Sequence, residues 1–395
     1  MSILTIGDIG VTEGIIHIGD EAMFEAAVDE LAARGAAVVG VSANPAESSE
    51  RYRVPTVARL GFAGLDRAAA RERAALLRVA AAGGVTLAAD DPAVEALAAL
   101  DSASGVLIAG GGNLASRWPV HVFERSTLAA MARTRGLPVV VTGQTFGPDL
   151  HDGDDEVVAE LTCHAAWTGV REHDSAALAR GWDARVRVGV DDASFLAGGP
   201  DDADRSNASG DVVVSLSGWF AGRPAETVEQ GIAELLDAAS ASVGPVVFHA
   251  HFGPIDQGPA SGDAALHERV RARMRRPSRV VPSGDSRRSA ELARRARLLI
   301  SSRYHPAVFA APAGVPVLGL AADDYTRIKL TGALGHWGQD AVVDLDELAD
   351  VPRRVEELDA ARSDIAERAD ARREAHRADA AAWWDTVAAA FAPAG

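Results

Sequence analysis

The chain alternates short apolar runs with alanine-rich amphipathic stretches along most of its length. Residues 1–6, 36–42 and 138–142 are apolar runs of strand length, and residues 20–34 carry an apolar stripe at helical spacing. Residues 65–82 form a second helical stretch, rich in Arg and Ala. This alternation predicts an α/β fold built on mostly parallel sheets.

One polar segment interrupts the alternation. Residues 197–210, AGGPDDADRSNASG, are dense in Gly, Asp, Ser and Asn and show no periodicity, which is typical of a linker. A strand over 211–216 then restarts the pattern. We therefore predict an N-terminal Rossmann-like domain over 1–200 and a second one over 211–350.

The C-terminal residues 351–395 form a helical segment that Trp383 and Trp384 are expected to pack back on the body of the protein. Two Rossmann-like domains followed by a long C-terminal helix predict a GT-B-type arrangement. In that arrangement the N-terminal domain takes the acceptor, the C-terminal domain takes the donor, and ligands bind at the carboxyl ends of the strands.

The charge and the cysteine content exclude several classes of protein. With 39 Lys and Arg against 56 Asp and Glu, the net charge is −17, which argues against a nucleic-acid binder and against a polybasic membrane anchor. No apolar run reaches the roughly 18 residues of a membrane span, and the N-terminus has no signal-peptide pattern. The single Cys163 excludes an internal disulfide. These features favour a cytoplasmic protein and leave a homo-oligomer open.

Three glycine-bearing segments follow predicted strands. The first leads through Gly19 to Asp20 and Glu21, where helix N–H groups could hold an anion, or where Asp20 could simply cap the helix. The second is a loop with Gly111, Gly112 and Asn113, and the third a loop over 143–148 with Gln144. Strand-end loops of one parallel sheet lie on the same edge, so these segments predict the rim of a cleft.

Arginine and aspartate follow two further strands of the same half. Arg171 lies between a strand and a helix, where its planar fork could bind a carboxylate or a phosphate. His173, nearby, is expected to be a polar turn residue. Asp191 and Asp192 follow the strand predicted over 185–190, and they could bind a hydroxyl group or a metal, or simply be solvated.

The segment 300–320 is the most informative part of the chain. Arg303 and His305 follow a predicted strand and precede an apolar helix, and Arg327 and Lys329 are predicted on the next strand-end loop. Lys329 is the one lysine of the chain. In a protein of net charge −17, such a positive cluster indicates an anionic ligand, with a buried salt-bridge cluster as the alternative.

The pair His249 and His251 follows the strand predicted over 246–248. Two histidines at this spacing could bind a metal, but the sequence shows no third ligand at a suitable spacing. The alternative, a loop that faces the cleft or the surface, is the one we expect.

Five short motifs, in order over about residues 1–335, resemble the polysaccharide pyruvyl transferase family. They are His17-Ile18-Gly19-Asp20-Glu21, Gly110-Gly111-Gly112-Asn113, Gly143-Gln144-Thr145-Phe146-Gly147-Pro148, Val170-Arg171-Glu172-His173-Asp174-Ser175 and Ser301-Ser302-Arg303-Tyr304-His305. His17 departs from the Asn usual in the family. The resemblance implies a GT-B-like enzyme that moves the pyruvyl group of phosphoenolpyruvate onto a sugar as a ketal, without a metal or a redox cofactor.

Roles follow from this resemblance as hypotheses. His305 would be the general acid, and Asp20, Glu21 or Asp192 would orient or deprotonate the acceptor hydroxyl. The cationic side chains would hold the phosphate and the carboxylate of the donor: Arg171, Arg303, Arg327 and Lys329.

Other functions stay open. The same cationic cluster would suit the diphosphate of a nucleotide sugar in a GT-B-type glycosyltransferase, or an anion in a non-catalytic protein of the same fold. The acceptor could be a polysaccharide, a lipid-linked sugar or a small metabolite.

Overall fold

The computed structural model describes residues 1–151, 153–196, 209–255 and 259–392. The chain forms two compact units. Unit 1 comprises residues 1–12, 23–192 and 378–395, and unit 2 comprises residues 13–22 and 193–377. The linker predicted over 197–210 falls almost wholly on residues 197–208, outside the described residues.

The described part of unit 1 contains a sheet of eight parallel strands. In spatial order they are β4 (Thr56–Ala58), β3 (Ala37–Ser42), β1 (Ser2–Ile6), β5 (Gly105–Ile108), β7 (Val139–Phe146), β8 (Trp167–Val170) and β9 (Val186–Val188), with β6 (Gly111–Leu114) also paired to β7. The helices are α2 (Pro45–Tyr52), α3 (Arg67–Ala81), α4 (Ala93–Ser102), α5 (Pro119–Thr134), α6 (Asp154–Cys163) and α7 (His173–Gly181).

Both faces of this sheet are covered, because successive side chains of each strand enter different apolar layers. Ile3 joins one layer, with Phe24 and Trp384, whereas its neighbour Leu4 joins the other, with Leu128. Strands buried on both faces need continuous apolar runs, which is the pattern seen in the sequence. Trp384 and its helix α14 (Arg362–Ala390) therefore close one face of the unit 1 sheet, as the sequence predicted.

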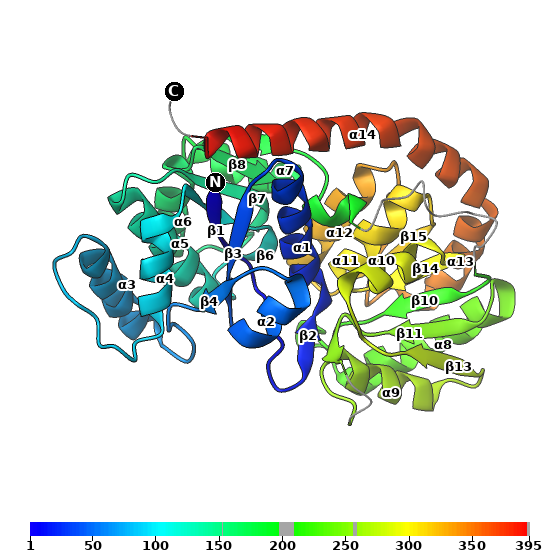
Figure 1. Ribbon diagram of the computed structural model, residues 1–395. Helices are drawn as coiled ribbons and strands as arrows, with labels where there is room; N and C mark the ends of the chain where they lie inside the picture. Colours follow the sequence, from blue (N-terminus) through cyan, green and yellow to red (C-terminus); the bar gives the residue numbers. More distant parts are fainter. Residues whose placement is uncertain (152, 197–208, 256–258, 393–395) are drawn as a thin grey trace. The chain divides into compact units, whose positions relative to one another are not determined.

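Unit 2 has its own parallel sheet, in the order β13 (Ser278–Val281), β11 (Val246–His249), β10 (Val212–Ser215), β14 (Leu298–Ser301), β15 (Val317–Ala321) and β16 (Val342–Asp344). A short antiparallel pair joins β2 (Ile15–His17) to β12 (Phe252–Pro254). The helices are α8 (Ala225–Ser242), α9 (Asp263–Arg273), α10 (Ser286–Arg294), α11 (Tyr304–Ala310), α12 (Asp324–Gly335) and α13 (Val351–Ala360) (Figure 1).

The predicted class, α/β with two Rossmann-like parallel-sheet domains and a long C-terminal helix, is confirmed. Helix α1 (Ile18–Ala33) begins two residues before Asp20, so Asp20 lies in its first turn and is not its cap. The unit boundary at residues 22 and 23 falls inside α1, and that at 377 and 378 falls inside α14.

Two segments that the sequence predicted as loops are partly strands. Gly111–Leu114 forms β6, and β7 continues through Gly143 to Phe146, with a register irregularity in its pairing. Gly143 has φ +48, a conformation that glycine adopts without strain, and this lets β7 change direction and still continue. Glycine is a turn signal in a sequence, but hydrogen bonds to a neighbouring strand override that signal here.

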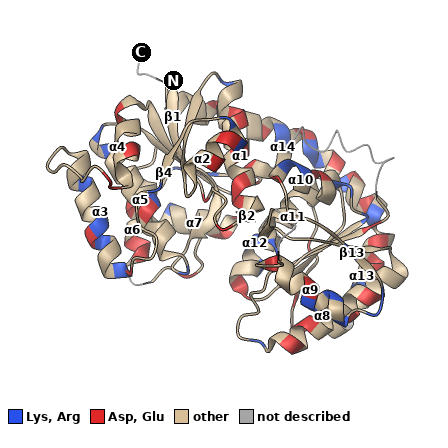
Figure 2. Cartoon of the chain, turned by 60° about the horizontal axis from the view of Figure 1, so that its bottom comes forward, with Lys and Arg blue, Asp and Glu red and all other residues tan. Residues whose placement is uncertain are grey.

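Figure 2 shows cationic and anionic residues interspersed along helices such as α3 and α14. Most arginines of these surfaces are matched locally, as in the pair of Arg78 with Glu160 and the pair of Arg269 with Glu229. Among the described residues, no helix is both long and apolar enough to cross a membrane.

Candidate active site

The carboxyl edge of the unit 2 sheet gathers residues that follow four of its strands, among them Arg303, which the sequence singled out. His251 follows β11, Trp219 follows β10, Arg303 follows β14 and Asp323 follows β15. Parallel strands end on the same edge, so these residues lie at the place where α/β proteins bind ligands. Ser217 and Ser302 tie two of these connections together, because the Ser217 N–H donates to the Ser302 hydroxyl at 2.7 Å.

His305 lies in the first turn of α11, one residue after Tyr304. Its side chain is partly exposed and lies against the first turn of α1 at Gly19. A Cβ atom at Gly19 would come within 2.6 Å of the imidazole Cγ of His305 and 2.7 Å of its Cε1. The glycine is therefore required for this close approach, and the sequence segment before Asp20 forms one wall of the His305 site.

Arg303 occupies the N-cap position of α11. Its side chain forms a bidentate ion pair with Asp263, the first residue of α9. Its Nε donates to Oδ2 at 2.8 Å and its Nη2 to Oδ1 at 2.5 Å. Asp263 is buried, and burial raises the pKa of this carboxyl although Arg303 acts in the opposite direction. The pair fixes the guanidinium in place, with 31% of the Arg303 side chain still exposed.

Lys329 and Arg327 lie on α12 and not on the strand-end loop that the sequence predicted. The loop after β15 is short because Asp323 caps the helix at once, accepting from the Thr326 N–H at 2.9 Å. Arg327 is paired with Asp344. The Lys329 ammonium instead lies 3.9 Å from the ring centroid of Tyr325 and 5.7 Å from that of Tyr304.

Lys329 makes no ion pair with any residue in the part of the chain that the structure describes. Tyr304 connects it to His305, since the rings of Tyr304 and His305 are 5.1 Å apart at their centroids. Lys329 and His305 thus border the same tyrosine. A cation held by aromatic faces and lacking a carboxylate partner is suited to an anionic ligand.

The histidines behind this edge are buried. His249 uses both ring nitrogens, toward the Val281 carbonyl at 3.1 Å and the Ser289 hydroxyl at 2.8 Å, which leaves neither of them for a metal. His251 contacts the Ser215 hydroxyl through Nδ1 at 3.0 Å. Burial lowers the pKa of both imidazoles, that of His251 well below 6.5, so both are neutral near pH 7.

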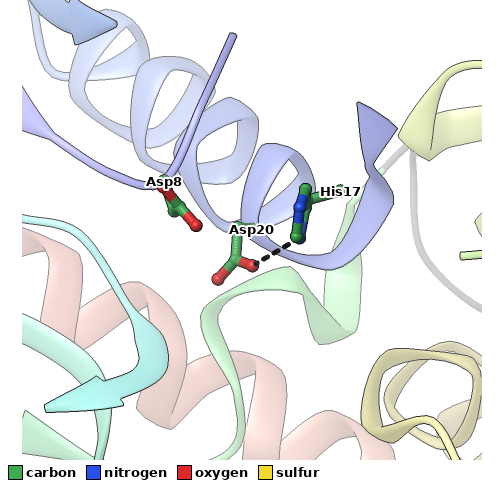
Figure 3. Close-up of side chains that lie close together, drawn as sticks. All are labelled: Asp8, His17 and Asp20. Carbon is green, nitrogen blue, oxygen red and sulfur yellow. Dashed lines mark ion pairs between the residues drawn. The ribbon is translucent and has the colours of Figure 1, made fainter. Parts of the chain in front are cut away.

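His17 and Asp20 flank the start of α1 (Figure 3). The Nδ1 of His17 lies 4.0 Å from Oδ2 of Asp20, and both side chains are at least partly exposed. The His17 ring also packs against Phe252, its partner in the β2–β12 ladder, with the ring centroids 4.2 Å apart and the planes tilted by 48°. Phe252 is the connecting residue, because the Arg303 guanidinium lies 5.8 Å from its ring centroid. Glu21, also predicted for the acceptor, is buried.

In unit 1, Arg171 is buried and does not project freely toward a ligand. Its Nη1 donates to Asp191 at 2.7 Å and its Nε to the Thr145 hydroxyl at 2.9 Å. Arg171, the first residue after β8, is thus hydrogen-bonded to residues near the carboxyl ends of β7 and β9. This arrangement suits a residue that positions the loop of Asp191 and Asp192 better than one that contacts a donor directly.

Asp192 lies beside Gly143, at 2.6 Å from the position that a Cβ would occupy there. Burial raises the pKa of Asp192 to about 7, and the neighbouring Asp191 adds to this rise. The Oδ2 atom of Asp192 is buried without a hydrogen-bond partner among the described residues, whereas the side chain as a whole is partly exposed. A carboxyl group with a pKa near neutrality is suited to accept a proton from a hydroxyl group.

The remaining predicted residues of unit 1 line the β6–β7 ladder. Gly111 pairs with Gln144 in register, and the Gln144 amide donates to the Ala109 carbonyl at 2.6 Å. Gln144 is fully buried, whereas Gly112 is partly exposed. Asn113 is buried, and its Oδ1 has no hydrogen-bond partner in the described structure. The Oε1 atom of Gln144 also has no partner among the described residues, so Asn113 and Gln144 each keep an acceptor atom available.

The sequence missed four residues of the unit 2 site: Phe252, Asp263, Tyr304 and Tyr325. Tyr304 lies inside a motif that was singled out, and Tyr325 lies four residues before Lys329, one helical turn away. Asp263 is 40 residues from Arg303, and the sequence carries no signal that joins them.

The fold is shared with solved structures of sugar-metabolising enzymes at low sequence identity. A putative UDP-N-acetylglucosamine 2-epimerase from Listeria monocytogenes has a TM-score of 0.55 at 11% identity, covering 91% of this chain and 90% of that chain. The UDP-GlcNAc 2-epimerase from Neisseria meningitidis, bound to UDP-GlcNAc, has a TM-score of 0.53 at 11% identity, with 94% and 98% covered. The calicheamicin glycosyltransferase CalG4 has a TM-score of 0.54 at 17% identity, with 99% and 98% covered.

At the level of sequence, no curated protein matches the chain. A family model does match, over residues 17–324. This range begins at His17, which packs against Phe252, and ends one residue after Asp323. It includes the Gly19–His305 contact and the Arg303–Asp263 pair, but not Lys329. The chain belongs to the polysaccharide pyruvyl transferase family.

Proposed function

We propose that the protein transfers the pyruvyl group of phosphoenolpyruvate to two hydroxyl groups of a sugar, forming a ketal and releasing phosphate. The observation that carries this proposal is the environment of the Lys329 ammonium. This ammonium is held by Tyr325 and Tyr304 without an ion pair among the described residues, on the tyrosine that also borders His305. A donor with a phosphate and a carboxylate would supply the missing negative charge next to an acid.

In the proposed reaction, His305 gives a proton to the vinyl CH2 carbon of the donor while a sugar hydroxyl attacks the adjacent carbon. The double bond is lost, a C–O bond forms, and the hydroxyl proton passes to a base. Phosphate then leaves with the electrons of its C–O bond. A second hydroxyl attacks the same carbon and closes the ketal, and its proton passes to the departing phosphate. The transition state carries oxocarbenium character, and a carboxylate would stabilise its positive charge.

Lys329 and Arg303 are the proposed donor ligands, with Arg327, two residues before Lys329 on α12, as a supporting charge. Arg303 is held by Asp263, which gives its guanidinium a fixed orientation at a small cost in entropy when a ligand binds. Arg171 has a different proposed role from the one that the sequence suggested. Its bond to Asp191 supports the loop that carries Asp192.

Two carboxylates are proposed to handle the acceptor hydroxyl groups. Asp192 has the pKa near 7 that suits a general base, and Asp20 is at least partly exposed on the first turn of α1. Gly112 and Asn113 are proposed to contact the sugar, through a backbone that a ligand can approach closely and through an available amide oxygen. Glu21 and Gln144 are buried, and we assign them to support of these loops.

The test is to incubate the protein with phosphoenolpyruvate and, separately, with nucleotide sugars, each with a panel of sugar acceptors. The proposal predicts phosphate release only with phosphoenolpyruvate and acceptor together, and a new ketal methyl signal in the proton NMR spectrum. Release of a nucleotide from a nucleotide sugar would instead support a glycosyltransferase. Binding of phosphoenolpyruvate without phosphate release for any acceptor would support a non-catalytic role.

A further inference from the structure

Trp219 is one of the few large apolar side chains that the described structure exposes, with 49% of its surface accessible. It lies in the connection between β10 and α8, at the same carboxyl edge as Arg303 and Asp323. Leaving an indole in water gives up the free energy that its burial would supply. An exposed tryptophan at a ligand-binding edge therefore indicates a binding role.

The indole ring is held in one orientation. Its Nε1–H donates to Oδ2 of Asp323 at 2.7 Å, and Asp323 uses its other oxygen to cap α12. Its backbone N–H lies 3.3 Å from the Ser217 hydroxyl. The polar edge of the ring is thus satisfied, and the remaining exposed surface is an apolar face.

The loop beneath the ring is fixed as well. Phe220, the next residue, is buried in the core of unit 2. Arg223 then donates to the Ala322 carbonyl at 2.6 Å and forms a bidentate pair with Asp346. A rigid aromatic face binds a ligand with little loss of conformational entropy.

Trp219 is attached to the helix that carries the proposed donor ligand. Asp323 is the N-cap of α12, and Lys329 lies six residues further, which is about 9 Å along a helix axis. This rise along the axis of α12 is comparable to the combined length of one sugar ring and one small acid. An acceptor ring on Trp219 could therefore present its hydroxyl groups to a donor held at Lys329.

We propose that Trp219 is the stacking platform for the sugar ring of the acceptor, binding the apolar C–H face of a pyranose. This inference rests on the proposed function for the identity of the acceptor. The Asp323 carboxylate that orients the ring belongs to the same platform.

The first experiment measures binding without turnover. Methyl glucopyranoside, methyl galactopyranoside and methyl mannopyranoside are titrated into the wild-type protein, Trp219→Phe and Trp219→Ala, with indole fluorescence as the signal. The inference predicts sugar-dependent quenching in the wild type and loss of that change in both variants, because the reporting indole is gone. Ligand-observed NMR then measures sugar binding directly. We expect retained sugar binding in Trp219→Phe and loss of sugar binding in Trp219→Ala.

Two results would overturn the inference. One is the absence of binding by all three sugars to the wild type. The other is quenching of Trp219 by UDP and not by sugars, which would assign the platform to a nucleotide.

The second experiment separates this inference from the proposed function. With an acceptor that the wild type uses, Trp219→Ala should raise the acceptor KM about tenfold or more and leave the phosphoenolpyruvate KM unchanged. The matched comparison is Trp118→Ala in unit 1, whose side chain is 45% exposed. A rise in acceptor KM for Trp118→Ala alone would refute the role of Trp219. Absence of phosphate release in the wild type would refute the proposed function, whatever the sugar-binding result.

Discussion

The imidazole of His305 lies directly against the backbone of Gly19, in the space that any larger residue would need for its Cβ. The two residues are far apart in the sequence, and each lies in the first turn of its own helix, α1 or α11. The contact explains the glycine that directly precedes Asp20. It also makes Gly19 a sensitive point for the position of the proposed general acid.

Gly19→Ala tests this relationship. Alanine favours a helix over glycine by about 1 kcal/mol, so the substitution should not lower the melting temperature through helix propensity. It should displace the His305 ring and lower kcat by about tenfold or more, since general acid catalysis depends on geometry. The measurement is kcat together with the melting temperature, with Gly181→Ala in helix α7, whose Cβ meets no atom within 4 Å, as the comparison. Unchanged kcat in Gly19→Ala would show that His305 needs no such precise placement.

Lys329→Gln should raise the KM for phosphoenolpyruvate about tenfold or more, because the ammonium without an ion pair is the proposed donor ligand. Lys329→Arg should restore only part of the binding, since a guanidinium is planar and larger than an ammonium. Arg327→Gln is the matched control on the same helix, and its pairing with Asp344 predicts a smaller effect. Equal KM values for the wild type and both Lys329 variants would remove Lys329 from the site.

The Arg303–Asp263 pair predicts a stability effect that is separate from activity. Arg303→Ala leaves the buried Asp263 carboxylate without its bidentate partner, which should cost about 3 kcal/mol of unfolding free energy. The exposed pair of Arg288 with Asp285 provides the control, and Arg288→Ala should change stability by less than about 1 kcal/mol. Urea unfolding measures both. A similar small loss in the two variants would mean that Asp263 is well solvated or already protonated.

Asp192 predicts a pH dependence of stability. Its pKa is about 7 in the folded protein against an ordinary value of 3.8, so between these values the folded state holds a proton that the unfolded state has lost. The unfolding free energy should therefore fall as the pH rises through this window. Asp192→Asn removes the effect, so its stability relative to the wild type should increase from about pH 4 to about pH 7 and then level off. A stability difference between Asp192→Asn and the wild type that stays constant from about pH 4 to about pH 7 would contradict this prediction.

The fold was predictable from the sequence because strands buried on both faces leave long apolar runs, as in β1 and β10. Helices α2 and α4 were missed, although Pro45 at the start of α2 is a favourable helix signal. The strand β6 was missed because Gly111, Gly112 and Asn113 have low strand propensity, and only pairing with β7 makes them a strand.

The candidate site was predictable only in part. Arg303 and His305 could be found because they follow a predicted strand at the ligand-binding edge. Lys329 could be found as the one lysine of the chain, but its place on α12 was not predicted. The partners of these residues could not, since Asp263 and Gly19 come close only through the folding of distant segments. The burial of Arg171 was equally hidden, because its pair with Asp191 depends on the pairing of β8 with β9.

The most direct test of the account is phosphate release from phosphoenolpyruvate by the wild type and by His305→Gln, measured with and without a sugar acceptor. The account predicts acceptor-dependent release and a ketal product for the wild type. For His305→Gln it predicts a loss of turnover of about a hundredfold or more with an unchanged melting temperature. Near-full turnover by His305→Gln, or nucleotide-sugar turnover by a wild type that releases no phosphate from phosphoenolpyruvate, would contradict it.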